Sequence, residues 1–215
     1  MKTRLFSSLG SLFSLTDEQA MWRVQMHDDA EAFAYLVEKW EEPIQRLCVR
    51  MLGDPHRAED LTQEAFSRIF ARRKEYQPAG KFSTFLWRVA LNLCYDELRR
   101  LKRRKEEALQ SSDSESDAFP AVGPAPDEMA VAREQAEMVR EALLQLPEAY
   151  RSVLVLRHYE NLKFREIAEV LDIPEGTVKS RMAEALTQLG RLLARAVEPK
   201  NNLWKIRRIE ENLML

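Results

Sequence analysis

The chain has 215 residues, of which 45% are hydrophobic and 32% are charged, and its formal net charge is −2. A chain of this length can form one large or two modest domains, and its near-neutral charge argues against a protein whose whole surface is basic for binding nucleic acid. Glycines are few, with 6 in the chain, and long stretches rich in Ala, Leu, Glu, Arg and Gln predict an all-α protein.

Residues 1–15 carry Lys2 and Arg4 ahead of leucines and phenylalanines, but Gly10 and several serines interrupt the apolar positions. A signal peptide has a denser apolar core, and no apolar run in the chain approaches the roughly 20 residues that cross a membrane. We therefore expect a mobile N-terminal arm and a cytoplasmic protein without membrane insertion.

The first domain, residues 16–107, is predicted to contain four helices. Thr16 or Asp17 caps the first of them, and Gly53-Asp54-Pro55 ends the second, which a proline at position 43 could bend. The helices are expected at residues 16–26, 29–52, 56–74 and 83–105, with a loop at residues 75–81.

The helix at 56–74 has a polar and acidic face opposite its core stripe of Leu61, Ala65 and Ile69. Such a face beside aromatic side chains is more typical of a protein docking surface than of a DNA surface, although an ordinary solvated helix face would show the same pattern. The polar face comprises Asp60, Gln63, Glu64 and Ser67, with Phe66 and Phe70 flanking it.

The helix at 83–105 combines two kinds of polar side chain on the side opposite its apolar residues. Cations attract phosphates, while aromatic and amide groups stack on or hydrogen-bond unpaired bases. This combination suits DNA that is being opened, whereas a solvated helix end would explain the charges alone. The apolar side comprises Phe82, Leu86, Val89, Ala90 and Leu93. The polar side comprises Arg88, Asn92, Tyr95, Arg99 and Lys102, with Trp87 at its edge and a basic run from Arg99 through Arg100 to Lys105.

Residues 108–127 are expected to be a flexible linker. The segment QSSDSESDAFPAVGPAPD, residues 110–127, contains no basic residue, and its Ser, Asp, Pro and Ala cannot bury much apolar surface. We expect this linker to join two helical domains, the second at residues 128–197, followed by a C-terminal extension at residues 198–215.

The second domain ends in two short amphipathic elements that flank Asp172-Ile173-Pro174. They are preceded by one helix that ends before Leu146 and by another that has Pro147 in its first turn and reaches about Tyr159. The two short elements predict a helix-turn-helix, whose second helix enters the major groove and reads base edges. A helical hairpin with solvated charges is the alternative. The outward face of the second element carries Gly176, Thr177, Ser180, Glu184 and Thr187, with Lys179 and Arg181 on its shoulders.

Cys48 and Cys94 lie in apolar helical sequence, without a CxxC motif or a Cys/His cluster. We expect buried, reduced thiols. The three histidines are scattered, and the chain lacks a glycine-rich phosphate loop, a nucleophile motif and clustered carboxylates. An enzyme is therefore the least favoured class, and no catalytic residue, metal or cofactor is expected.

Three segments together resemble the sigma-70 family of bacterial RNA polymerase sigma factors, in particular its extracytoplasmic function (ECF) group. The first, AEDLTQEAFSRIF at 58–70, resembles the polymerase-binding helix of region two. The second, KFSTFLWRVALNLCYDELRRLKRR at 81–104, resembles the segment that melts the promoter and recognises its minus-ten element. The third, residues 146–189, resembles region four, which binds the minus-thirty-five element.

The resemblance implies a fold of two small helical domains and a function in promoter-specific initiation, with promoter DNA and core RNA polymerase as partners. The polymerase would be contacted at its clamp and its flap, and the protein would be monomeric outside that complex. An anti-sigma factor would inhibit it and could hold it at the membrane. It implies a polymerase contact at Asp60, Gln63, Glu64 and Phe66. It implies minus-ten contacts at Phe82, Ser83, Trp87, Arg88, Asn92, Tyr95, Arg99 and Arg100, and minus-thirty-five contacts at Thr177, Lys179, Ser180, Arg181 and Glu184.

Some positions depart from the family pattern. Ala183 and Glu184 stand where many relatives carry an aromatic or basic residue, so the promoter sequence cannot be carried over. Glu184 would accept from a cytosine amino group or would weaken phosphate binding. Lys163 stands where a serine often caps a helix, which moves the expected cap to Asn161. The extension containing Trp204 lies beyond the family pattern, and either packs on the second domain or binds a partner.

Two other classes of protein remain as alternatives. A helix-turn-helix regulator that acts without polymerase would use the second domain but leave residues 58–104 without a role, and it predicts tight promoter binding by the free protein. An anti-sigma or adaptor protein would leave the basic helix and the recognition face unexplained.

Overall fold

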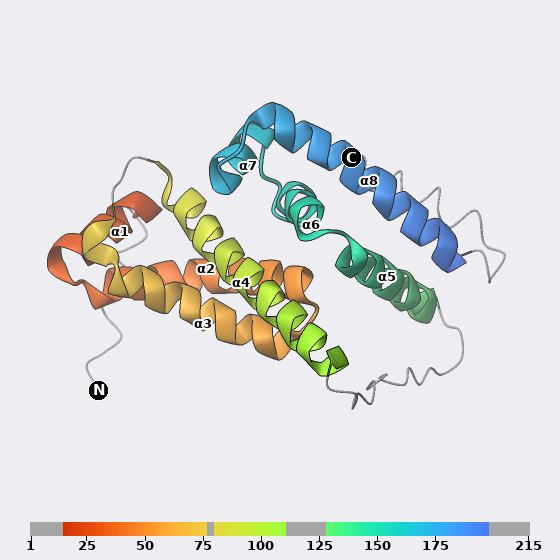
Figure 1. Cartoon of the computed structure of the whole chain (residues 1–215). Helices are drawn as coiled ribbons and strands as arrows, with labels where there is room; N and C mark the ends of the chain where they lie inside the picture. Colours follow the sequence, from red (N-terminus) through yellow and green to blue (C-terminus); the bar gives the residue numbers. More distant parts are fainter. Residues whose placement is uncertain (1–14, 77–79, 111–127, 198–215) are drawn as a thin grey trace.

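The computed structural model describes residues 15–76, 80–110 and 128–197. The predicted N-terminal arm, most of the linker and the C-terminal extension with Trp204 lie outside these ranges. Within them every regular element is a helix (Figure 1), so the all-α prediction is confirmed. None of the described helices is both long and apolar enough to span a lipid bilayer.

The first domain consists of four α-helices and a short 3₁₀ turn. The helices are α1 (Asp17–His27), α2 (Ala30–Leu52), α3 (Pro55–Ala71) and α4 (Phe82–Gln110), with the turn at Arg73–Glu75. The second domain consists of α5 (Glu128–Gln145), α6 (Glu148–Leu154), a π-helical turn (Val155–Tyr159), α7 (Phe164–Leu171) and α8 (Glu175–Val197). The two domains lie side by side, with α7 against α4 and α5 against α2 (Figure 1).

Side-chain caps fix where the first three helices begin. The Thr16 hydroxyl accepts from the Gln19 N–H at 3.2 Å, and the Asp29 carboxylate caps α2 in the same way. Asp54 accepts from two N–H groups of α3, at 2.9 and 3.1 Å, and Pro55 follows at the first helical position. Because these caps satisfy N–H groups that have no partner within the helix, the predicted helix starts agree with the structure to within one residue.

The ends of α3 and α4 differ from the prediction, and so does the geometry of the helix after Pro147. Helix α3 ends at Ala71 rather than at residue 74. Helix α4 continues to Gln110 and includes residues 108–110, which were predicted to be linker, because no glycine or proline stops it before them. The helix after Pro147 changes from α to π geometry at Val155, and Pro147 is its N-cap rather than part of its first turn. Helix α2 runs through position 43, as predicted.

The core of each domain is formed by the predicted apolar stripes. Cys48 on α2 and Cys94 on α4 are fully buried in the first domain, with their Sγ atoms 3.6 Å apart and no disulfide between them. Their predicted burial is confirmed. The largest fully buried side chains are Met21, Leu36, Ile44, Leu47, Met51, Ile69, Phe82, Leu86 and Leu91 in the first domain, and Leu146, Leu154 and Leu156 in the second.

Candidate nucleic-acid and protein interfaces

The polar face of α3 is exposed. Asp60, Gln63 and Glu64 project from it to solvent, because the opposite side of the helix is buried. Asp60 pairs with Arg57 at 3.1 Å and Glu64 with Arg68 at 2.7 Å. These are surface pairs, which contribute little to stability, so the carboxylates are free to change partner when a basic surface approaches.

The two phenylalanines of α3 are not the exposed flanks that the sequence predicted. Phe66 is only 6% exposed, and its ring packs edge-on against Phe33 with the ring centroids 6.4 Å apart. Phe70 is half-buried against the same ring. Phe66 follows Thr62 and precedes Ile69 at helical spacing, which places it in the core stripe.

The predicted minus-ten residues of α4 separate into three groups. Phe82 is fully buried in the core, and Trp87 is 4% exposed, with its ring edge-on to Trp40 at 5.7 Å. The expectation that Trp87 lies at an open edge is therefore wrong in this arrangement. The exposed residues are Arg88, Asn92 and Arg99, and the half-buried ones are Ser83, Tyr95 and Arg100.

A buried carboxylate organises the basic half of α4. Glu97 is 6% exposed and accepts from Arg57 Nε and Nη2, at 2.8 and 3.1 Å. Arg100 lies 3.3 Å from the same carboxylate. The hydrogen bonds from Arg57 hold the pKa of Glu97 below its ordinary value. Arg100 is thus partly committed to the fold. The sequence analysis did not identify Glu97. The one sequence signal was that Glu97 is an acidic residue beside a strongly basic run, and this signal alone does not indicate burial.

The predicted recognition helix, α8, exposes its polar face at its N-terminal half. Lys179 and Ser180 are exposed, while Thr177, Arg181 and Glu184 are half-buried. Lys179 pairs with a glutamate one turn earlier at 2.7 Å. The opposite face is buried, through Val178, Met182, Ala185, Leu189 and Leu193. The five predicted minus-thirty-five residues therefore lie together on one helix, which follows α7 after a tight turn.

The turn between α7 and α8 begins with a residue in the left-handed conformation, and a second such residue precedes α7. Asp172 ends α7 with φ +55°, and Asn161 has the same φ before α7. The predicted cap at Asn161 is wrong, because the N–H group of Lys163 instead donates to the Glu166 carboxylate at 3.0 Å. Lys81 binds this carboxylate too, and both interactions lower its pKa.

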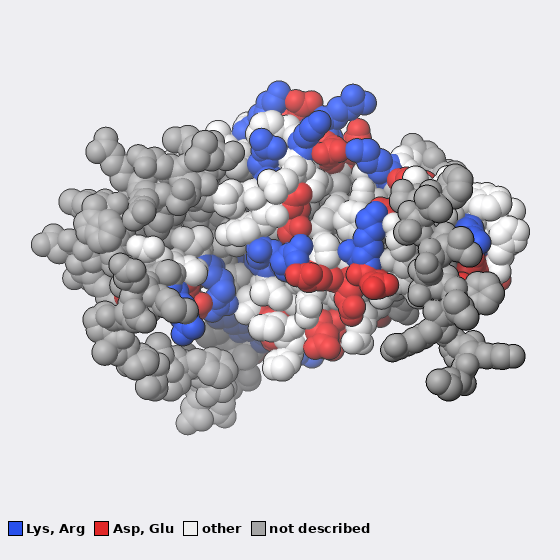
Figure 2. Space-filling view, turned by 180° about the vertical axis from the view of Figure 1, so that it is seen from behind, with Lys and Arg blue, Asp and Glu red and all other residues white. Residues whose placement is uncertain are grey.

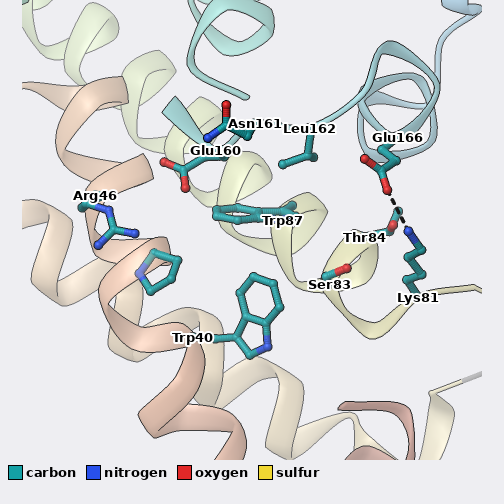
Figure 3. A pocket seen from close by; sticks show the side chains of 11 residues that line it. Trp40, Arg46, Lys81, Ser83, Thr84, Trp87, Glu160, Asn161, Leu162 and Glu166 are labelled. Atoms are coloured by element: carbon teal, nitrogen blue, oxygen red, sulfur yellow. Dashed lines mark hydrogen bonds and ion pairs between the residues drawn. The ribbon is translucent and has the colours of Figure 1, made fainter. Parts of the chain in front are cut away.

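A cavity of about 330 Å³ lies between the two domains. Figure 3 shows Trp40 and Trp87, whose rings meet edge-on, on one side of the cavity, with Glu160 above them. The Lys81–Glu166 ion pair, 2.7 Å long, lies at the right of the view. Sequence reasoning missed Trp40, Glu160 and Glu166, since each belongs to an apolar or acidic stretch with no motif of its own.

The surface charge is mixed. On the face seen in Figure 2, basic and acidic side chains of the described residues alternate, without a broad area of one sign. This agrees with the net charge of −2 and means that any attraction for DNA is local.

Comparison with known proteins assigns both domains. The family model of sigma-70 region 2 matches residues 36–104, and that of sigma-70 region 4 matches residues 136–189. The chain is 37% identical over 160 residues to the ECF RNA polymerase sigma factor SigW of Bacillus subtilis, which covers 72% of this chain and 84% of that relative.

Two solved structures share the fold. CnrH, solved in complex with the cytosolic domain of CnrY, has a TM-score of 0.63 and 20% identity, and the match covers 83% of this chain and 97% of CnrH. The sigma factor RpoE of Bartonella quintana, solved with the anti-sigma factor NepR, has a TM-score of 0.59 and 18% identity, with 77% of this chain and 98% of RpoE covered. The chain belongs to the ECF group of the sigma-70 family and is an RNA polymerase sigma factor.

Proposed function

We propose that this sigma factor binds the clamp of core RNA polymerase through α3 and reads promoter DNA through α4 and α8. The observation that carries this proposal is the placement of three polar faces on three helices, each opposite a buried stripe, in two separate domains. Two separate reading helices suit a promoter with two spaced elements, since one domain then addresses each element.

The exposed carboxylates and amide of Asp60, Gln63 and Glu64 would dock on a basic surface of the polymerase clamp. Their charges would steer association and fix its register more than they would add affinity. Phe66, being buried, would support α3 from within rather than touch the polymerase. The second domain would contact the polymerase flap through α6.

Helix α4 would hold the minus-ten element while its strands separate. Arg88, Asn92 and Arg99 are exposed and present donors to phosphates and bases, and Tyr95 lies on the same side of the helix. Ser83 instead lines the cavity beside Trp87 and would reach DNA there. Arg100 would add phosphate attraction while it stays near Glu97. Phe82 would support this surface from the core. Trp87 would contact DNA only after the side chains that bury it move away.

Helix α8 would enter the major groove at the minus-thirty-five element. Lys179 and Arg181 would hold phosphates, and Thr177 and Ser180 would reach the backbone or base edges. Glu184 accepts a hydrogen bond from Gln188 at 2.9 Å, and it would accept from a cytosine amino group if that partner moved.

We further infer an anti-sigma partner and a cytoplasmic location. The sigma factor RpoE of Bartonella quintana, which shares the fold, was solved with an anti-sigma factor, and this motivates a search for such an inhibitor here. The polymerase acts in the cytoplasm, and only such a partner would hold the chain at a membrane. The chemistry of RNA synthesis would belong entirely to the polymerase.

Reconstituted transcription tests this proposal. Core polymerase with the chain should initiate from a subset of a promoter library, and core alone should not. Asp60→Ala with Gln63→Ala should reduce binding to core, whereas Glu38→Ala, an exposed carboxylate on α2, should not.

The DNA-binding surface has its own control. Lys179→Ala with Arg181→Ala should keep core binding and lose promoter selection, whereas the same loss of charge on α8 at Arg191 and Arg195 should leave selection intact. If the chain selects duplex promoters without core, and core does not bind it, the proposal is wrong and an autonomous regulator is the better description.

A further inference from the structure

Helix α1 carries two large apolar side chains on its surface. Trp22 is 52% exposed and Met26 is 57% exposed, and because they are four residues apart they are neighbours on one face of the helix. The indole of Trp22 meets the His27 ring edge-on, with the ring centroids 5.3 Å apart. Single exposed apolar residues are ordinary on protein surfaces, so the meaning of this pair depends on where it lies.

Two hydrogen bonds place this face of α1 beside the start of α4. The Glu18 carboxylate accepts from the Phe82 N–H at 3.2 Å, and the Gln25 side chain donates to the Tyr76 carbonyl at 2.7 Å. Trp22 follows Glu18 by four residues and precedes Gln25 by three, so it shares their face, about 6 Å along the axis from the first and about 4.5 Å from the second. Figure 1 shows α1 at the end of the first domain where α4 begins.

The end of α4 next to α1 is the end at which melted DNA should leave the helix. The cations of α4 concentrate near its C-terminus, at residues 99–105. Duplex DNA carries a denser row of phosphates than a single strand, so we expect the upstream duplex at that end. The unpaired bases that follow the minus-ten element toward the start site would then pass the N-terminus of α4, where α1 lies.

The chemistry of this face suits a single strand. An indole ring stacks on any base, because every base has a π face, and proteins that bind single strands combine such rings with cations for the backbone. Arg23, Arg72 and Lys74 are exposed here. Arg23 pairs with Asp29 and Lys74 with Asp28, each at 3.3 Å. Surface pairs of this kind contribute little to stability, so both cations are able to turn to a phosphate.

We propose that Trp22 stacks on an unpaired base of the strand that α4 holds, just past the minus-ten element toward the start site, and that Met26 packs beside that base. This inference rests on the proposed function of α4. It gives a role to a helix outside the region 2 match, which begins at residue 36, whereas α1 ends at His27.

The contact should stabilise the open promoter rather than choose among promoters. Stacking on an aromatic ring tolerates any base sequence, and the polar side chains of α1 beside Trp22 are already engaged, with Glu18 bound to Phe82 and Gln25 to Tyr76. The lifetime of the open complex is therefore the quantity that the indole should change.

The test compares wild type, Trp22→Phe and Trp22→Leu as full-length proteins bound to core polymerase. Phenylalanine keeps a ring that can stack, whereas leucine keeps apolar area without a ring. Both should fold, because position 22 is half-exposed and both residues are compatible with a helix. Open complexes are formed on a promoter taken from the selected library, with 2-aminopurine placed singly at each position between the minus-ten element and the start site.

The emission of 2-aminopurine falls when the base stacks, so wild type should show one quenched position just past the minus-ten element. Trp22→Leu should lose that quenching, and its open complexes should dissociate about tenfold faster after a heparin challenge, the order expected for one stacked base. Trp22→Phe should lie between the two. The control Leu101→Ala removes another exposed apolar side chain, nearer the C-terminal end of α4, and should keep the quenching. All four proteins should bind core equally.

Two outcomes would overturn the proposal. A Trp22→Leu protein with the quenching and lifetime of wild type would show that the indole does not stack on DNA. Weaker core binding by Trp22→Leu, with no quenched position in wild type, would show that the apolar pair docks on polymerase instead. Failure of the wild type to form any open complex would reject the proposed function and this inference with it, whereas the first two outcomes leave the proposed function standing.

Discussion

Gly53→Ala is a sharp probe of the junction between the two domains. Gly53 ends α2 with φ +79° and ψ −3°, and its N–H donates to the Val49 carbonyl at 2.7 Å. An L-residue in this left-handed conformation costs about 1–2 kcal/mol. The added Cβ would also lie 2.5 Å from Leu144 Cδ1 of the second domain, far inside van der Waals contact.

The two costs can be separated because only the second arises between the two domains. Turning Leu144 out of the way forces it off its rotamer, at about 0.5–1.5 kcal/mol. We therefore expect Gly53→Ala to lower the free energy of unfolding by about 2–3 kcal/mol in wild type. In a Leu144→Ala background it should cost only the backbone part, so the double-mutant cycle should give a coupling of about 1 kcal/mol.

Urea unfolding followed by circular dichroism measures all four proteins of the cycle. Gly176→Ala is the control, because no atom lies within 4 Å of the added Cβ and its φ is not positive; as a helical position it should be neutral or gain stability. Zero coupling between Gly53 and Leu144 would refute the packing of α5 against the end of α2. A cost-free Gly53→Ala would refute the left-handed helix end.

Three further predictions concern the first domain. Asp54→Ala should lower the free energy of unfolding by about 1 kcal/mol, because the Asp54 carboxylate caps two N–H groups of α3. Thermal unfolding measures this loss, and Asp54→Asn should retain most of the stability because its amide oxygen can still accept from these N–H groups. Ellman's reagent should react with neither Cys48 nor Cys94 in the native protein and with both in denaturant, since both are buried; rapid native reaction would contradict this packing. Hydrogen bonds from Arg57 lower the pKa of Glu97 below its ordinary value, so the stabilising effect of the carboxylate is present above the unfolded-state pKa and lost as the pH falls through the folded-state pKa. Wild type should therefore lose more stability than Glu97→Gln between about pH 5 and pH 3, and equal losses would refute the assignment.

Local features made the helices predictable. Thr16, Asp29 and Asp54 are residues whose short acceptor side chains cap helices wherever they precede an apolar repeat, and Gly53 supplies the stop after α2. The same reasoning placed the two elements of the helix-turn-helix, since their apolar spacing has the period of a helix. Where no glycine or proline ends the helix, as in α4, the sequence predicted the C-terminal end of the helix too early.

Features that depend on the partner of a side chain were less predictable. The polar face of α3 was found from spacing alone, but the burial of Phe66 depends on Phe33, which is distant in sequence. The π-helical turn after Leu154 breaks no propensity rule, so nothing in the sequence marked it. The cap of α7 was expected at Asn161 because Lys163 stands where family members often carry a capping serine, whereas in the structure the Glu166 carboxylate, inside the first turn, accepts from the Lys163 N–H.

The contacts between the two domains show why the role of a residue cannot be derived from its place on a helix alone. Arg88 was assigned to DNA because a cation beside amide and aromatic groups suits a melted strand, and that chemistry is indifferent to whether the acceptor is a phosphate or a carbonyl. The end of α7 offers the second kind of acceptor at 2.5 Å. A guanidinium meets either acceptor with the same donors, so the position of Arg88 on its helix does not decide which acceptor it binds.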